Sequence, residues 1–289
     1  MATNPKKMII KSPQNPRLKA LKRLTTRRER ARSGHFLVEG EDLVLAAREA
    51  LREPVEGFCL LGSELGNGRF HELEPALMKD LSTLGSGTRV IAIYEQRWTQ
   101  PHGPLCVYLH GVGDPGNVGT ILRSAHAFGA SCVALGPGCA DPHSPKAVRA
   151  SMGAIFSVAL ARARDVGELP GERVALVADA REVLRGHCSL PGPRSLPGPG
   201  SLPSDALADE RDVAGANVSG DRRAGGAMTL LVGAERDGLP ADVVAACERS
   251  ARIAIATESL NAAMAATVAL YEVTRADERA PVSSRVRAS

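Results

Sequence analysis

Residues 113–124 read GDPGNVGTILRS and join a glycine-rich turn to the start of an amphipathic helix. The three glycines permit positive φ angles and the close approach of another group, while Pro115 fixes the turn. Asn117 is a candidate N-cap for a helix over 118–128, and Arg123 lies off the apolar stripe of that helix. Six helical residues rise about 9 Å, so Asn117 and Arg123 could converge on one substrate. A phosphate cradle, a tight turn and a catalytic arginine are the open alternatives.

Two common nucleotide-binding motifs do not fit this turn. A phosphate-binding P-loop ends in Gly-Lys-Ser or Gly-Lys-Thr, and the turn contains no lysine. A dinucleotide fingerprint requires GxGxxG, which is not the spacing of GDPGNVG. The turn therefore predicts either a capped strand-to-helix connection or a site of another kind.

The turn belongs to a series of alternating strands and helices. We expect apolar strands in LCVYLHGV (105–112), ASCVALGPG (130–138), RVALVADA (173–180), MTLLVGAE (228–235) and ARIAIA (251–256). Helices are expected over 118–128, 144–156, 241–249 and 260–276. Because these strands are apolar throughout, the pattern predicts an α/β fold with a mostly parallel sheet covered by helices on both faces.

A smaller α/β unit is expected before this sheet. Its strands are predicted in HFLVEG (35–40), GFCLLG (57–62) and TRVIAIY (88–94), and its helices over 17–32, 42–51 and 71–84. EQRWTQPHGP (95–104) has the composition of a linker. We therefore divide the chain into a first domain, 1–100, a second domain, 105–277, and a flexible tail, 278–289.

A Pro/Gly-rich stretch interrupts the second domain. Ser-Leu-Pro recurs at 189, 195 and 201, and the segment lacks the apolar content needed to offset the entropy of ordering. We expect 187–226 to be a disordered insertion without a function of its own.

Basic charge is concentrated at the N-terminus. Eleven of the 36 Lys and Arg residues, but only one of the 32 Asp and Glu residues, lie in 1–32. The rest of the chain therefore holds 25 basic and 31 acidic residues. A local excess of this kind suits a polyanion such as RNA, because bound phosphates release their counterions. A solvated arm without a partner is the alternative.

Composition argues against a membrane protein and against a zinc site. No apolar run approaches the roughly 20 residues of a membrane span, and the N-terminus lacks a secretory signal, so a cytoplasmic location is expected. The six cysteines are scattered, without CxxC or a His/Cys cluster, which indicates no metal site and isolated thiols.

Two further segments place polar residues directly after apolar strands. LLVGAERDGLP (230–240) opens into a second glycine loop that carries Glu235. ARIAIATESLNAA (251–263) leads through Ser259 and Asn261 into the last helix. Open α/β sheets bind ligands beyond the C-terminal ends of their parallel strands. The three segments together therefore predict one site at this edge of the sheet.

These segments resemble the motifs of the SpoU (TrmH-type) family of RNA ribose methyltransferases, in the SPOUT superfamily. The family's first motif, Asn-x-Gly followed by Arg, is matched by Asn117, Gly119 and Arg123. Its second, a Gly-x-Glu-x-x-Gly-Leu loop, is matched by Gly233, Glu235, Gly238 and Leu239. Its third, Ser-Leu-Asn at a helix start, is matched by Ser259, Leu260 and Asn261. SPKAVRASMGA (144–154) is also similar. The likeness covers about 105–275 apart from the insertion. It departs from the family pattern at His110, at Ala254 and in AAMAAT (262–267).

The N-terminal part is similar to the family's RNA-binding extension, which has a ribosomal-protein-like α/β fold. SPQNPRLKALKRL (12–24) and FLVEGEDLV (36–44) carry this likeness. It implies RNA contacts by the basic arm, and our candidates are Lys11, Asn15, Arg17, Lys19, Lys22, Arg23, Arg27 and Arg28.

The resemblance implies methyl transfer from S-adenosylmethionine to a ribose 2′-hydroxyl of structured RNA, with ribosomal RNA as the expected substrate. Arg123 would hold the hydroxyl or a phosphate, Asn117 would orient it, Glu235 would brace the arginine or the loops, and Ser259 and Asn261 would close the site. The cofactor would contact Val232, Gly233, Ile253, Ile255 and Leu260. The resemblance also implies a C-terminal trefoil knot and a homodimer in which the site borrows residues from the partner.

Other functions stay open at this level. Transfer RNA is the alternative substrate, and a non-catalytic RNA-binding protein of the same fold is the alternative to an enzyme. An α/β enzyme for a small nucleotide is a further possibility, although it leaves the basic arm unexplained. Glu235 and Asn261 have simpler roles available too, as caps of a turn and of the last helix.

Overall fold

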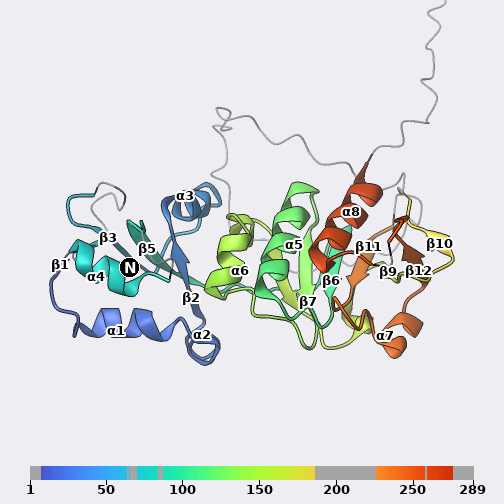
Figure 1. Cartoon of the computed structure of the whole chain (residues 1–289), viewed down its shortest axis with the longest axis horizontal. Coiled ribbons are helices and arrows are strands. Elements are labelled where there is room, and N and C mark those ends of the chain that lie inside the picture. Colours follow the sequence, from blue (N-terminus) through green and yellow to red (C-terminus); the bar gives the residue numbers. More distant parts are fainter. Residues whose placement is uncertain are drawn as a thin grey trace, which may run out of the picture.

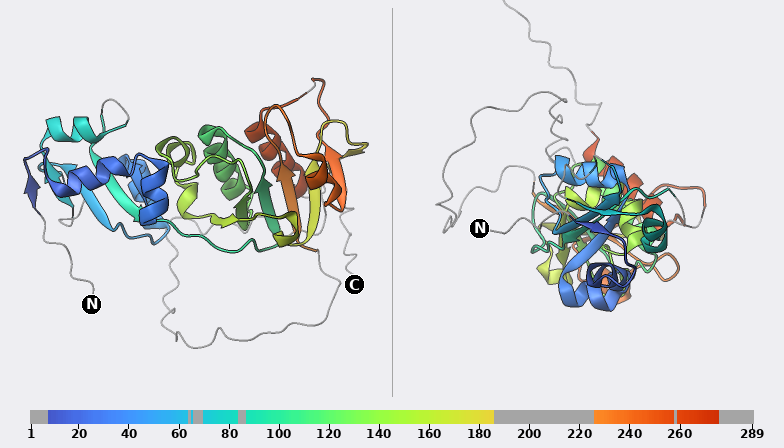
Figure 2. Two further views of the ribbon diagram at one scale, coloured as in Figure 1. Left: turned by 90° about the horizontal axis from the view of Figure 1, so that it is seen from below. Right: turned by 90° about the vertical axis from the view of Figure 1, so that its left-hand side faces the viewer.

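The structure is a computed structural model of the 289-residue chain, and it describes residues 8–63, 65, 70–83, 87–185, 226–257 and 259–275. The expected insertion at 187–226 lies outside these residues apart from its last position, and the expected tail at 278–289 lies wholly outside them. The elements form two sheet-containing units side by side along the long axis of the molecule (Figures 1 and 2).

The first unit is a mixed five-stranded sheet in the order β1-β4-β3-β5-β2. β1, β4 and β3 are parallel to one another, whereas β5 is antiparallel to both β3 and β2. The strands are β1 (Ile9–Ile10), β2 (His35–Glu39), β3 (Glu56–Leu60), β4 (His71–Leu73) and β5 (Val90–Glu95). The helices are α1 (Pro16–Arg23), α2 (Arg27–Ser33), α3 (Glu41–Glu49) and α4 (Pro75–Leu81).

The predicted helix over 17–32 is in fact two helices, α1 and α2. The hydroxyls of Thr25 and Thr26 bond the carbonyls of Lys22 and Arg23, and Thr26 then accepts from the Glu29 N–H as the N-cap of α2. Threonine side chains compete in this way with the helical hydrogen bonds, which explains the break. The predicted helix over 71–84 was also wrong at its start, because residues 71–73 form β4.

The second unit is a seven-stranded sheet in the order β10-β12-β9-β11-β6-β7-β8. Every neighbouring pair is parallel, which confirms the predicted α/β class with a mostly parallel sheet. Its strands are β6 (Leu105–Leu109), β7 (Cys132–Leu135), β8 (Ala159–Arg162), β9 (Glu172–Leu176), β10 (Glu182–Val183), β11 (Met228–Val232) and β12 (Arg249–Arg252). The short strands β8 and β10 were missed from the sequence.

Helical segments cover both faces of this sheet. One face packs against α5 (Pro115–Ala127), α6 (Pro145–Ala150), α8 (Ala262–Thr274) and the 3-10 turn η1 (Ala154–Phe156) (Figure 1). The other face packs against the 3-10 turn η2 (Val166–Glu168) and α7 (Ala241–Ala245). Alternate residues of β6 serve the two cores: Leu105, Val107 and Leu109 face one, and Cys106 and Tyr108 the other.

The last helix, α8, carries a row of alanines that packs inside the subunit. Ala262, Ala266 and Ala269 are buried, and α8 lies against α5. At this contact the hydroxyls of Ser124 and Thr267 are 2.6 Å apart. Alanine lets the two helices approach closely, so the Ala-rich sequence serves packing within one chain.

The two units share one continuous core. Phe36 and Tyr94 of the first sheet pack on Phe156, with ring centroids 6.1 and 5.0 Å apart. Beside them the buried guanidinium of Arg30 donates to Asp141 at 2.8 Å. The segment expected as a linker is fixed as well, since the Thr99 N–H donates to the Leu160 carbonyl at 2.8 Å. The second sheet is therefore held firmly beside the first.

Candidate active site

Three loops carry the predicted site, and the sheet order brings them together. They follow β6, β11 and β12, and β6 and β11 are direct neighbours while only β9 separates β11 from β12. Because all of these strands are parallel, the loops lie at the same edge of the sheet.

The helix after the first loop begins earlier than predicted. α5 starts at Pro115, and its N-cap is Asp114, whose Oδ1 accepts from the Asn117 N–H at 3.0 Å. Asn117 is therefore inside the first turn, and its prediction as the N-cap was wrong. The ammonium of Lys146 lies 2.6 Å from Asp114 Oδ2 and, together with the Asn117 N–H, lowers the pKa of this carboxyl.

The expected close approach is found at one glycine of this turn, but the expected positive φ angles are not found there. None of Gly113, Gly116 and Gly119 has a positive φ. A Cβ on Gly119 would lie 2.3 Å from the Ala147 carbonyl oxygen, so this glycine allows α6 to approach α5. The positive φ belongs to Gly111, at +69°. Gly119 thus serves helix packing rather than contact with a ligand.

A chain of polar side chains connects the three loops. The amide nitrogen of Asn117 donates to Glu235 Oε1, and the amide oxygen of Asn117 accepts from the Asn261 amide at 3.1 Å. Glu235 thus contacts the first loop and not Arg123. Asn261 also accepts from the N–H groups of Ala263 and Met264 as the N-cap of α8. It therefore combines the capping role with a contact to Asn117.

A pocket of about 400 Å³ opens beside this polar chain. It is lined by all five predicted cofactor contacts and by Glu235 and Ser259; the five are Val232, Gly233, Ile253, Ile255 and Leu260. A Cβ on Gly233 would lie 2.2 Å from the backbone of Gly238, so glycine is needed for the second loop to fold back on itself. The loop is closed by two backbone hydrogen bonds between Ala234 and Gly238.

Arg123 stands apart from these residues. It is exposed on α5, and no hydrogen bond or ion pair joins it to any residue that the structure describes. Six positions along a helix turn it about 120° from Asn117. The structure therefore joins Asn117, Glu235 and Asn261 by hydrogen bonds and places Glu235 and Ser259 in the pocket lining, but it does not place Arg123 there.

The predicted RNA contacts lie on and next to α1 and α2. Lys11, Lys19, Arg23, Arg27 and Arg28 are exposed. Arg17 is paired with Glu56, and Lys22 lies 2.6 Å from Asp80. Asn15 is the N-cap of α1 and accepts from the Arg17 N–H, so it has a structural role in addition to the predicted one.

One wall of the pocket, at the end of β9, was not predicted from the sequence. Leu176, Val177, Ala178 and Asp179, at the end of β9, line it together with Arg236 and Arg252. Asp179 was expected inside a strand over 173–180, but β9 ends at Leu176, so Asp179 lies in the loop beyond it. Ending the expected strand there would have placed Asp179 at the same edge as the other loops.

The described ranges contain neither a candidate metal site nor a candidate membrane span. These residues contain no group of three or more His, Cys, Asp or Glu side chains that could hold a metal ion. Within the same ranges, no helix is both long and apolar enough to cross a membrane. The cysteines within these ranges are free thiols, as expected, and two of them, Cys106 and Cys132, are register partners on β6 and β7.

Comparison with protein families gives two matches. The SpoU rRNA Methylase family matches residues 104–176 and 206–271, and an MRM3-like substrate binding domain matches residues 15–92. The first match is interrupted over 177–205, a range that overlaps the expected insertion.

Several curated proteins are similar to this chain. It is 30% identical over 185 residues to the 23S rRNA (guanosine(2553)-2'-O)-methyltransferase RlmP of Bacillus subtilis, covering 59% of this chain and 73% of that protein. It is 31% identical over 209 residues to the mitochondrial rRNA methyltransferase 3 of Xenopus laevis, covering 62% and 50%. An uncharacterized tRNA/rRNA methyltransferase of Mycobacterium tuberculosis is 36% identical over 174 residues, covering 58% and 50%.

Solved structures match almost the whole chain. An rRNA methyltransferase from Sinorhizobium meliloti has a TM-score of 0.71 at 26% identity, covering 92% of this chain and 96% of that one. The methyltransferase AviRb from Streptomyces viridochromogenes, in complex with AdoMet, has a TM-score of 0.68 at 25% identity, covering 90% and 97%.

Proposed function

The chain belongs to the SpoU rRNA methylase family, and from this premise we propose that it transfers a methyl group from S-adenosylmethionine to a ribose 2′-hydroxyl of ribosomal RNA. The observation that carries the proposal is the polar chain Glu235–Asn117–Asn261, of which Glu235 lines the 400 Å³ pocket. The chain connects this pocket to the first turn of α5 over the ends of parallel strands, where a group can pass between two substrates.

The pocket residues fit S-adenosylmethionine. The pocket volume, about 400 Å³, lies within the range of sites for ligands of the size of S-adenosylmethionine. Val232, Ile253 and Leu260 offer apolar contacts for an adenine ring, and the close backbone at Gly233 narrows the pocket on one side. Asp179 and Glu235 offer carboxylates at the rim for the cationic end of the same molecule. When bound, the cofactor supplies an activated methyl group on a sulfonium.

The protein residues must then hold the hydroxyl in line and stabilise its oxygen as the proton leaves. Asn117 is fixed by two partners, so Glu235 and Asn261 keep the first loop at a set distance from the pocket. Arginine serves proteins as a fixed positive charge and a hydrogen-bond donor. We assign it to the 2′-hydroxyl or its neighbouring phosphate, where its charge stabilises the developing oxyanion.

Ribosomal RNA is the proposed substrate because the Bacillus subtilis and Xenopus laevis relatives are named for it, and the Mycobacterium tuberculosis relative is named for transfer or ribosomal RNA. We assign RNA binding to the first domain, 1–100, and methyl transfer to the second, 105–277. The exposed basic side chains of α1 and α2 would contact phosphates. A cytoplasmic location is part of the same proposal.

A homodimer would explain the position of Arg123. Away from its buried alanines, α8 exposes an apolar stripe that includes Met264, 61% exposed, and Tyr271, 51% exposed. The ring centroid of Tyr271 lies 6.3 Å from that of Phe128, the residue that follows α5, the helix that carries Arg123. Pairing of two chains over this surface would bring Arg123 near the partner's pocket. Sedimentation velocity should then give the mass of two chains, and a single-chain mass at working concentrations would contradict the dimer.

Titration of the full chain with S-adenosylmethionine tests the cofactor assignment. We expect saturable binding, because the pocket is already formed in the chain. A substitution that adds a Cβ at Gly233 should abolish it, since that atom would meet the Gly238 backbone. Absence of binding by the unaltered chain would exclude the proposed activity.

A further inference from the structure

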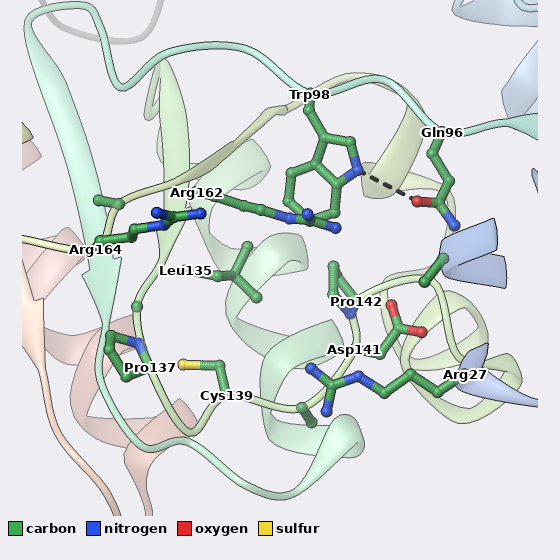
Figure 3. A pocket seen from close by; sticks show the side chains of 14 residues that line it. Arg27, Gln96, Trp98, Leu135, Pro137, Cys139, Asp141, Pro142, Arg162 and Arg164 are labelled. Carbon is green, nitrogen blue, oxygen red and sulfur yellow. Dashed lines mark hydrogen bonds between the residues drawn. The ribbon is translucent and has the colours of Figure 1, made fainter. Parts of the chain in front are cut away.

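A second cavity, of about 440 Å³, lies where the two units meet. Its walls come from α2, from the connecting segment at Gln96 and Trp98, and from the loops that follow β7 and β8 (Figure 3). It shares no lining residue with the pocket at β9, β11 and β12. It is thus a separate cleft, and it has no role in the proposal above.

The cleft contains a fixed aromatic and guanidinium pair. The Cζ atom of Arg162 lies 4.1 Å from the centroid of the Trp98 ring. The indole N–H donates to Gln96 Oε1 at 3.2 Å (Figure 3). The indole ring also meets His143 edge-on, with ring centroids 5.2 Å apart. The backbone of the next residue, Thr99, is held by β8. The pair is therefore preorganised, as a platform for stacking requires.

The cleft carries an excess of positive charge. Arg27, Arg162 and Arg164 line it and extend toward the same space (Figure 3). None of the three guanidiniums has a hydrogen bond or ion pair to a residue that the structure describes. The only acid in the lining is Asp141, whose carboxylate already accepts from Arg30.

The nearby imidazole does not add to this charge. Burial lowers the pKa of His143 to about 4, so it is neutral at pH 7. The charge available to a ligand is therefore that of the three arginines, and the ligand that they favour is anionic.

The cleft lies at the same edge of the sheet as the proposed methyl-transfer site. Gly136 and Pro137 follow β7, and Ala163 and Arg164 follow β8. Arg162 ends β8, which is three strands from β11 in the sheet, and this corresponds to about 14 Å. About four stacked nucleotides of one strand cover this distance. On its other side, the cleft borders α2 and its exposed basic residues.

We propose that this cleft binds an unpaired nucleotide of the RNA substrate, a few positions from the one that is methylated. Its base stacks on the Arg162 and Trp98 pair, and the flanking phosphates pair with Arg27 and Arg164. The inference rests on RNA as the substrate of the proposed function. An unpaired nucleotide is specified because a base inside a duplex is covered by its neighbours and cannot stack on a protein side chain.

An RNA-binding measurement tests the proposal. A short labelled single-stranded RNA of mixed sequence is titrated with the protein, and its fluorescence anisotropy is measured at several salt concentrations. The full chain is compared with the double variant Arg27→Gln, Arg164→Gln. Loss of two phosphate contacts should reduce the magnitude of the slope of log K against log salt by about 1.4, since each contact contributes about 0.7. The matched control is Arg181→Gln, Arg185→Gln, which removes the same charge beside β10, at the opposite end of the sheet from β8. It should leave the slope unchanged.

The stacking platform is tested by a second pair of variants. Trp98→Leu should weaken RNA binding about tenfold at an unchanged salt slope, because stacking does not release counterions. Trp98→Phe should retain most of the affinity. S-adenosylmethionine titrations of every variant show whether the second domain is still folded.

Three results would overturn the proposal. The first is an unchanged salt slope in the Arg27→Gln, Arg164→Gln variant. The second is a loss of affinity in the Arg181→Gln, Arg185→Gln control that equals the loss in that variant. The third is stronger binding of an RNA duplex than of the single strand. These are distinct from failure of the proposed function, which would appear as absent S-adenosylmethionine binding by the unaltered chain, whatever its affinity for RNA.

Discussion

Replacing Arg123 with alanine should lower the rate of methyl transfer to RNA by about a hundredfold to a thousandfold, the usual cost of removing a group that stabilises charge in the transition state. The affinity for S-adenosylmethionine should be largely unchanged, because Arg123 does not line the 400 Å³ pocket. Single-turnover methylation with saturating cofactor measures the first quantity, and calorimetric titration measures the second. Stability should also be unaffected, since the side chain is exposed and contacts no described partner.

Two variants sharpen this experiment. Arg123→Lys keeps the positive charge but loses the forked geometry, so an intermediate rate is expected. Arg181→Ala removes another exposed arginine, at the far end of the same sheet, and should leave the rate unchanged. Full activity of Arg123→Ala would remove this residue from the mechanism.

Replacing Asn117 with alanine should lower turnover by about tenfold to a hundredfold. The change removes the donor to Glu235 and the acceptor for Asn261, so the first loop loses its two contacts with the others. Small displacements of positioning groups have effects of this size on rate. The melting temperature should change little, because the helix is capped by Asp114 and not by Asn117.

The matched control for this variant is Asp114→Ala. Loss of the N-cap should cost about 1 kcal/mol of stability, while the Glu235–Asn117–Asn261 chain keeps its members. We therefore expect one variant to lose activity without stability and the other to lose stability with less effect on turnover. Urea unfolding and single-turnover rates measure the two effects. If both variants lost stability and activity together, Asn117 would be a structural residue.

The sheet and its edge could be predicted from the sequence because strands buried on both faces leave continuous apolar runs. LCVYL and MTLLV are such runs, and they pair directly as β6 and β11. The polar residues that follow them then had to share an edge. β8 was missed because ALAR is short and partly exposed, and it has no run that periodicity could detect.

The start of α5 shows a local ambiguity. Asp114 and Asn117 are both good N-caps, and the sequence prediction took the second. Proline favours the first helical position, so Pro115 pointed to Asp114. The polar chain could not be derived from the sequence in this form, because it joins side chains 118 and 144 positions apart through geometry alone.

The cleft at the junction of the two units could not be predicted from the sequence, for a similar reason. The connecting segment was expected as a plain linker. Its Trp98 acquires a role only because Thr99 docks on Leu160 and places the ring under Arg162. Contacts between segments about 60 positions apart leave no periodic signal in either segment.

The most direct test of the account is the identity of the methylated atom. The full chain is incubated with ribosomal RNA and S-adenosylmethionine, the RNA is digested to nucleosides, and the products are separated and identified by mass spectrometry. We expect a nucleoside methylated on its ribose 2′-oxygen, and we expect it to be absent when Arg123→Ala replaces the unaltered chain over the same time. A methyl group on a base, or no transfer by a chain that binds S-adenosylmethionine and RNA, would contradict it.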